Sequence, residues 1–153
     1  MKRSGVATNL RAVFDTNVFV AAALSHSDTS PTRELIDRWE REQFTLLTCE
    51  QLAQEIAEKL GERGIDDAVI EHYIATLAQL AEWITVSSES VVPVLPDPDD
   101  DVVLACAVLG RATHLVTYDP HFDILNGNYQ EITILKALPF LWIVRGDKKP
   151  ADE

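Results

Sequence analysis

The sequence predicts an α/β fold, a three-layer α/β/α domain with a mainly parallel central sheet. Short apolar stretches of strand type alternate along the chain with longer helical stretches, which is typical of a parallel sheet covered on both faces. A length of 153 residues suits one domain with its own core. We expect residues 10–145 to form this domain, between a flexible N-terminus (residues 1–9) and a flexible tail (residues 146–153).

The expected elements follow from apolar patterning and from turn residues. We predict strands at residues 11–15, 44–48, 83–86, 114–117 and 131–135, and helices at residues 18–24, 31–42, 49–60, 67–81, 99–109, 120–125 and 137–144. Ser30 is a suitable cap for a helix that has Pro31 in its first position. Thr48 and Gln51 have the spacing of a capping box, and Asp66 is a further helix cap. No internal repeat or second domain is visible.

Composition excludes several classes of protein. Hydrophobic residues make up 46% of the chain and charged residues 25%, which is ordinary for a soluble globular protein. No apolar run is long enough to span a membrane, and no signal peptide follows the basic N-terminus, so we expect a cytoplasmic protein. Cys49 and Cys106 are expected to be buried free thiols. The histidines show no paired spacing, which argues against a zinc site.

The formal net charge of −12 argues against nonspecific nucleic-acid binding through a basic surface. It does not exclude a nuclease, because a metal ion at an acidic site can itself meet the phosphate. The basic residues lie on different predicted helices: Arg33, Arg38, Arg41, Lys59, Arg63 and Arg111. Those of residues 31–42 are interleaved with acids and are expected to form ion pairs with them; guiding phosphate is the alternative.

Several carboxylates fall where a strand ends or a helix begins. Asp15 and Asp119 each follow a predicted strand, and in a parallel sheet the binding crevice lies beyond the carboxyl ends of the strands. Asp123 is a weaker candidate for the same site, with a turn residue as the alternative. Clustered ionised carboxylates repel each other and need a positive charge, and oxygen ligands suit Mg²⁺ or Mn²⁺. The alternative is that Asp15 only caps the next helix and Asp119 only forms a turn.

Glu55 is the acid of its helix that fits such a site. Leu52, Ile56 and Leu60 share one core-facing stripe, and at about 100° per residue Glu55 lies on its border. Glu50 and Glu58 point to the far side. The alternative is a solvated glutamate at the edge of the helix.

The run Asp-Pro-Asp-Asp-Asp (residues 97–101) opens a helix that is apolar all round and therefore expected to be buried on every side. Asp97 is a good cap, and acids in the first turn complement the helix dipole. One or two acids would suffice for that role, and three consecutive acids repel each other. We therefore expect this run to contribute to the acidic site.

The order of these motifs resembles that of the PIN domain, the nuclease fold of VapC-like toxins of toxin–antitoxin pairs. The resemblance extends over residues 13–141. It rests on Val-Phe-Asp-Thr-Asn-Val (residues 13–18), the helix with Glu55, the run at residues 97–107, and His-Leu-Val-Thr-Tyr-Asp (residues 114–119). The family often has a second acid two residues after the last of these, where this chain has His121.

The resemblance implies a divalent-metal site, with Mg²⁺ or Mn²⁺ as the cofactor. The implied catalytic and metal-binding residues are Asp15, Glu55, Asp100 and Asp119, with Asp101 as the adjacent candidate for a ligand. Thr16, Asn17 and Thr117 would orient carboxylates or water. The implied activity is hydrolysis of RNA phosphodiesters. The implied partners are an RNA substrate, a cognate antitoxin and a second copy of the chain.

Three other functions are alternatives. A phosphoacceptor receiver domain generally has an acidic pair after its first strand and a late lysine, and a haloacid-dehalogenase-like phosphatase needs Asp-x-Asp there. This chain has Asp15-Thr16-Asn17 instead. The third alternative is a PIN-like domain that binds protein or RNA without cleaving it. A dimer face could draw on Trp39, Trp83, Phe140, Leu141 and Trp142, although core packing is expected for at least half of them.

Overall fold

The computed structural model describes residues 9–147. Most of the two predicted flexible ends lies outside the described residues, and the limits of the predicted domain stay a prediction. In chain order the elements are β1 (Arg11–Phe14), α1 (Thr16–Leu24), α2 (Pro31–Glu40), β2 (Thr45–Thr48), α3 (Glu50–Glu62), α4 (Asp67–Leu80), β3 (Glu82–Trp83), η1 (Ser88–Ser90), α5 (Pro98–Leu109), β4 (His114–Val116), η2 (Pro120–Leu125), β5 (Asn128–Tyr129), β6 (Ile132–Leu135) and α6 (Ala137–Arg145).

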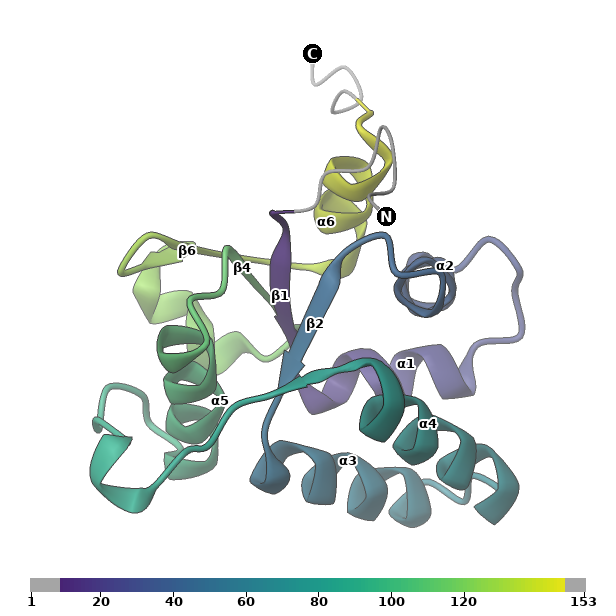
Figure 1. The fold of residues 1–153 in the computed structure, drawn as a ribbon, viewed down its shortest axis with the longest axis horizontal. Helices are drawn as coiled ribbons and strands as arrows, with labels where there is room; N and C mark the ends of the chain where they lie inside the picture. The colour runs from purple at the N-terminus through teal and green to yellow at the C-terminus, as the bar shows by residue number, and fades with distance from the viewer. Residues whose placement is uncertain (1–8, 148–153) are drawn as a thin grey trace.

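The strands form one six-stranded sheet in the order β3-β2-β1-β4-β6-β5. All neighbouring pairs are parallel except β5 and β6, so the predicted mainly parallel sheet is confirmed. Helix α5 packs on one face of β1, β2 and β4, whereas α1, α2 and α6 lie on the other side (Figure 1). Helix α3 contacts both α1 and α5, so it closes the carboxyl end of the sheet between the two helical layers.

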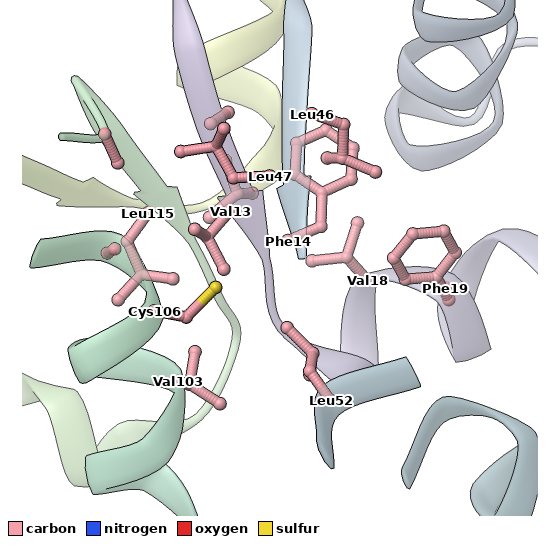
Figure 2. Packing of buried hydrophobic residues seen from close by; sticks show 14 of the residues in the cluster. Val13, Phe14, Val18, Phe19, Leu46, Leu47, Leu52, Val103, Cys106 and Leu115 are labelled. Carbon is pink, nitrogen blue, oxygen red and sulfur yellow. The ribbon is translucent and has the colours of Figure 1, made fainter. Parts of the chain in front are cut away.

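Strand alternation explains how the core fills both faces of the sheet. In Figure 2, Val13 lies on the side of Leu115 and Cys106, while the next residue, Phe14, lies on the side of Val18 and Phe19. All of these side chains are fully buried or nearly so. Successive side chains of a strand point to opposite faces, so β1 at the centre of the sheet must be apolar on both. The requirement for apolar side chains on both faces determines where β1 ends, and therefore where Asp15 lies.

Helix ends agree with the sequence in part. Ser30 accepts a hydrogen bond from the Arg33 N–H, and Asp97 accepts one from the Asp99 N–H, as their cap roles predict. The predicted capping box at Thr48 is wrong. Cys49 occupies the cap position without a side-chain hydrogen bond, because β2 continues through Thr48. Asp66 stands at the cap position of α4 but makes no side-chain hydrogen bond to it.

Two strands differ from the prediction. The strand expected at residues 83–86 is only Glu82–Trp83, because its neighbour β2 ends at Thr48 and offers no partner beyond it. Strand β5 was not predicted. It forms a hairpin with β6 through Gln130 and Glu131, which both have positive φ (48° and 71°). Such two-residue turns usually contain Asn or Gly, so Gln-Glu gave no turn signal.

Burial answers three further expectations. Of the proposed dimer-face residues, Trp39, Phe140 and Leu141 are at most 1% exposed and pack in the core, as expected for at least half of the set. Helix α5 is not buried on every side, because Leu109 at its end is 45% exposed. Cys49 and Cys106 are both buried and free, as predicted. Within the described residues, no helix has the length and apolar character that crossing a membrane requires.

Candidate metal centre

The end of β1 and the end of β4 bring Asp15 beside Thr117. The Asp15 N–H donates to the Val116 carbonyl oxygen at 2.9 Å, which extends the parallel pairing of the two strands by one residue. The Thr117 hydroxyl then donates to Asp15 Oδ2 at 2.7 Å and accepts the Asp119 N–H at 2.9 Å. Asp15 also caps α1 by accepting the Thr16 N–H at 2.8 Å. One side chain therefore caps a helix and faces a second strand end.

Helix α5 delivers the third carboxylate. Asp15, Asp100 and Asp119 each contribute one oxygen to a group whose members all lie within 4.8 Å of one another. Asp15 and Asp100 are buried, and Asp119 is partly exposed. The three acids come from β1, α5 and β4, as predicted from strand ends and from the helix start. A second group with the same spacing joins Asp97, Asp100 and His121.

The electrostatics of the cluster are unfavourable for bare carboxylates. Burial raises the pKa of Asp15 above its usual value and outweighs the hydrogen bonds from Thr117 and Thr16, and the charge of Asp119 raises it further. Burial also raises the pKa of Asp100, to about 7, and the charges of Asp119, Asp15 and Asp97 add to it. A hydrogen bond with His121 acts in the opposite direction. A cation would relieve this cost by favouring the ionised form of each acid.

Asp101 does not join the cluster, although it is adjacent to Asp100 in the chain. Its Oδ1 accepts the N–H groups of Val94 and Leu95 at 3.0 and 2.8 Å, and the residue is 4% exposed. One residue along a helix turns a side chain by about 100°, so neighbours must face different ways. The expectation of Asp101 as a metal ligand is therefore not supported by its position. It holds the segment before α5 in place.

Glu55 lies at the edge of the site rather than within the cluster of three aspartates. It stands on α3, whose Leu52, Ile56 and Leu60 are buried as predicted. Burial raises the pKa of Glu55, and the charges of Asp15 and Asp99 raise it further. The nearby Thr16 hydroxyl lowers the pKa of Glu55 by a smaller effect than burial has. The interaction of Glu55 with the cluster is therefore a repulsion between its carboxylate and that of Asp15.

His121 is the residue that the sequence did not identify as part of the site. Its Nδ1 lies 2.9 Å from Asp100 Oδ2 and 3.4 Å from Asp119 Oδ1. The hydrogen bond to Asp100 and the charge of Asp119 raise the pKa of His121. The His121 N–H also donates to Asp119 Oδ1 at 2.9 Å, a turn that an Asp-Pro-His sequence favours and that could have indicated the contact. An imidazole thus contacts two of the three carboxylates of the cluster.

The other expected residues have modest roles. Asn17 accepts the Tyr118 N–H through Oδ1 at 3.1 Å and so ties α1 to the segment after β4. Asp97 caps α5, and Asp99 is exposed. Asp123 is exposed within η2. Thr117, in contrast, contacts the cluster directly through Asp15.

A family model for the PIN domain matches residues 11–121, which include every acid of the cluster. The chain belongs to the PIN domain family. No curated protein sequence is similar enough to count as a relative. Two solved structures share the fold of this PIN domain.

The first is VapBC2 from Rickettsia felis, solved bound to a DNA fragment from its promoter. It is 14% identical, with a TM-score of 0.53, over 82% of this chain and 97% of that chain. The second is Mycobacterium tuberculosis VapC20, described as a toxin that cleaves the sarcin–ricin loop. It is also 14% identical, with a TM-score of 0.55, over 80% of this chain and 98% of that chain. At this identity the likeness establishes the fold of the PIN domain.

The donor set of this PIN domain fits a hard divalent cation. Three carboxylates offer oxygen atoms, which Mg²⁺ and Mn²⁺ prefer, and at least two of the three have raised pKa values that a cation would lower. The cysteines cannot serve as ligands here, because both are buried in the core and absent from the two groups of potential ligands found in the described residues.

Proposed function

We propose that this PIN domain is a metal-dependent ribonuclease that hydrolyses RNA phosphodiester bonds and acts as the toxin of a toxin–antitoxin pair. The observation that carries the proposal is the approach of Asp15, Asp100 and Asp119 to within 4.8 Å of one another. Two of these acids are buried, and within residues 9–147 no lysine or arginine forms an ion pair with any of the three, which favours a bound metal ion. The described cleavage activity of VapC20, which shares the fold, supports RNA as the substrate.

Asp15, Asp100 and Asp119 would hold Mg²⁺ or Mn²⁺. Glu55 lies at the edge of the site, where its charge interacts with that of Asp15. The bound ion would lower the pKa of a water molecule and offset the negative charge that develops on the phosphate oxygens. The chain's own contribution is orientation. Thr117 fixes one oxygen of Asp15 and the backbone of Asp119 at once, so two of the carboxylates have a fixed relation before any ion arrives.

The metal is tested by calorimetric titration of Mg²⁺ and Mn²⁺ into the wild type, Asp15→Asn and Asp100→Asn. We expect the wild type to bind and both variants to lose most of their affinity while keeping the fold, because each variant removes one charged ligand. Glu71→Gln, which removes an exposed acid on α4, is the matched control and should bind as the wild type does. A folded wild type without metal binding at millimolar concentration would favour the non-enzymatic alternative, a domain that binds RNA or protein.

Cleavage is tested with the same proteins and single-stranded RNA. Asp15→Asn should reduce metal-dependent cleavage by about 10²-fold or more, since loss of one charge-stabilising group at an active site has effects of that size. Activity of Asp15→Asn equal to that of the wild type would remove Asp15 from the mechanism. Sequencing of RNA ends from cells that express the protein would then identify the target.

We infer an antitoxin partner and a homodimer as well. An arginine inserted at the cluster would pair with the carboxylates and exclude the metal, and VapBC2 is named as a complex. A basic protein encoded beside this chain should therefore inhibit RNA cleavage. A homodimer predicts a mass of about twice 17.0 kDa by light scattering, and the monomer mass would contradict it. The proposed location is the cytoplasm, to be checked by fractionation.

A further inference from the structure

An open hollow borders the acidic cluster on the side of β6. It has a volume of about 280 Å³ and lies between the segment after β4, the end of η2 and the end of β6. The lining residues with a bearing on ligands are Tyr118, Asp119, Phe122, Asn126, Leu135 and Lys136. Asp119 belongs to both the hollow and the metal-binding cluster. A molecule that fills the hollow is therefore adjacent to the proposed reaction centre.

Lys136 gives this hollow a positive charge that the second hollow at the site lacks. The second hollow, about 300 Å³ in volume, is lined by Glu55, Glu58 and Asp99 and by no lysine or arginine. Lys136 is exposed, and its side chain forms no hydrogen bond or ion pair within residues 9–147. In a chain of net charge −12, a cation next to the cluster favours a polyanion on this side.

Helix α6 adds to the same effect. Lys136 stands at its cap position, no side chain caps its first N–H groups, and no acid lies in its first turn. The N-terminus of a helix carries partial positive charge, which favours phosphate. A lysine at this end is unfavourable for the isolated helix, so helix stability does not explain its presence.

Tyr118 and Asn126 supply the groups that a nucleobase needs. Tyr118 is 38% exposed, and its backbone is held by the hydrogen bond to Asn17. Asn126 adopts a left-handed conformation (φ 56°) at the end of η2 and lines the hollow. Unstacked bases of single-stranded RNA bind by stacking on aromatic rings and by hydrogen bonds to their edges. The hollow thus combines a ring, an amide and a cation beside Asp119.

We propose that this hollow binds the nucleotide next to the cleaved phosphate of single-stranded RNA. The base stacks on Tyr118, and a neighbouring phosphate pairs with Lys136. The inference rests on the proposed ribonuclease function, because it places the same substrate at the same site. It assigns Tyr118 and Lys136 to substrate binding and leaves the metal to the three aspartates.

The test measures binding apart from cleavage. A fluorescently labelled pool of randomised single-stranded RNA of about ten nucleotides is titrated into Asp15→Asn and into the double variants that add Lys136→Ala, Tyr118→Leu or Tyr118→Phe. Lys136→Ala should weaken binding and lower the slope of log affinity against log salt concentration by about 0.7. Tyr118→Leu should weaken binding about fivefold or more, whereas Tyr118→Phe should bind normally because the ring remains.

The control is Arg41→Ala, which removes one positive charge at the C-terminal cap of α2, where Arg41 pairs with Asp37. It should leave the salt slope unchanged. Thermal melting checks that every variant is folded. The proposal would be overturned if Lys136→Ala and Tyr118→Leu bound RNA as tightly as the control does. Absence of RNA binding by the Asp15→Asn parent would also overturn it. Metal affinity is also measured in the single variants Lys136→Ala and Tyr118→Leu, which keep Asp15. These single variants should bind metal as the wild type does even if cleavage is never observed. This measurement separates the RNA-binding proposal from the ribonuclease proposal.

Discussion

The Thr117 hydroxyl donates a 2.7 Å hydrogen bond to Asp15 Oδ2, although 102 residues separate the two in the chain. The Thr117 hydroxyl oxygen also accepts a hydrogen bond from the Asp119 backbone N–H, so one hydroxyl group links two residues of the cluster. Both bonds are available because β1 and β4 are parallel neighbours that end at the same edge of the sheet. The site therefore depends on a single buried threonine as much as on the acids.

Replacement of Thr117 tests this link. In Thr117→Val the Asp15 carboxylate loses a hydrogen bond and the Asp119 N–H loses its acceptor, so we expect a loss of about 1.5–3 kcal/mol in the free energy of unfolding. Thr117→Ser keeps the hydroxyl and should retain most of the stability and activity. Urea denaturation and RNA cleavage measure the two effects. Equal behaviour of the valine and serine variants would show that the hydroxyl is not required.

The raised pKa values predict an unusual dependence of stability on pH. Asp100, with a pKa near 7, and Asp15 bind protons more tightly in the folded state than in the unfolded state, where an aspartate has a pKa near 3.8. The folded protein then holds more protons, so the free energy of unfolding falls as pH rises from about 4 to about 7. His121 has a raised pKa too, and its contribution is present below 6.5 and lost at higher pH.

Chemical denaturation of metal-free protein between pH 5 and 7 checks this dependence. The acids with lowered pKa, Glu34 and Glu82, contribute stability that is fully present above about pH 4.5 and is lost only in more acidic solution, so they do not mask the trend in this range. Asp100→Asn should flatten the pH dependence, and Mg²⁺ should restore stability most strongly near pH 7 in the wild type. Metal-free stability that rises between pH 5 and 7 would contradict the assigned electrostatics.

Asp101 should separate folding from metal binding. Asp101→Ala leaves the N–H groups of Val94 and Leu95 without their acceptor, which should cost about 1–3 kcal/mol of stability. Metal affinity of the folded fraction should stay close to that of the wild type. Thermal melting and calorimetry give the two values. If Asp101→Ala lost metal binding as Asp100→Asn does, Asp101 would be a ligand after all.

Glu55 should have an intermediate effect. Glu55 lies outside the group of three aspartates, but it interacts with the charge of Asp15. Glu55→Gln should therefore lower metal affinity by about 10–100-fold, which is less than the effect of Asp100→Asn. The variant should also be more stable than the wild type at pH 7 without metal, since it removes a repelling charge. Calorimetry of the two variants under one set of conditions compares them. An effect as large as that of Asp100→Asn would make Glu55 a direct ligand.

Much of this site was predictable because simple geometry constrains it. Asp15 and Asp119 follow apolar strands, and parallel strands end at one edge, so their proximity follows from the pattern of the chain. The choice between Asp100 and Asp101 was open, because it depends on the position of residues 94 and 95, which belong to an irregular segment without periodicity. Strand β5 was missed since its turn contains Gln130 and Glu131 rather than the residues that usually mark such turns.

His121 shows a different limit. Its place in the chain was noted, but its contact with Asp100 joins η2 to α5, and no pattern in either segment specifies how they approach. The same holds for the hollow at Lys136: its lining residues all lie within residues 117–136, but no pattern in that stretch specifies how its segments pack around the hollow.

The first turn of α5 performs three tasks with adjacent aspartates: Asp97 caps the helix, Asp100 enters the cluster and Asp101 anchors the preceding segment. Insertion or deletion of one residue here would rotate every following side chain by about 100° and misdirect all of them together. The number of residues between Asp97 and Asp101 should therefore matter to the site as much as the acids themselves. Engineered variants that lengthen the protein should place their extra residues elsewhere.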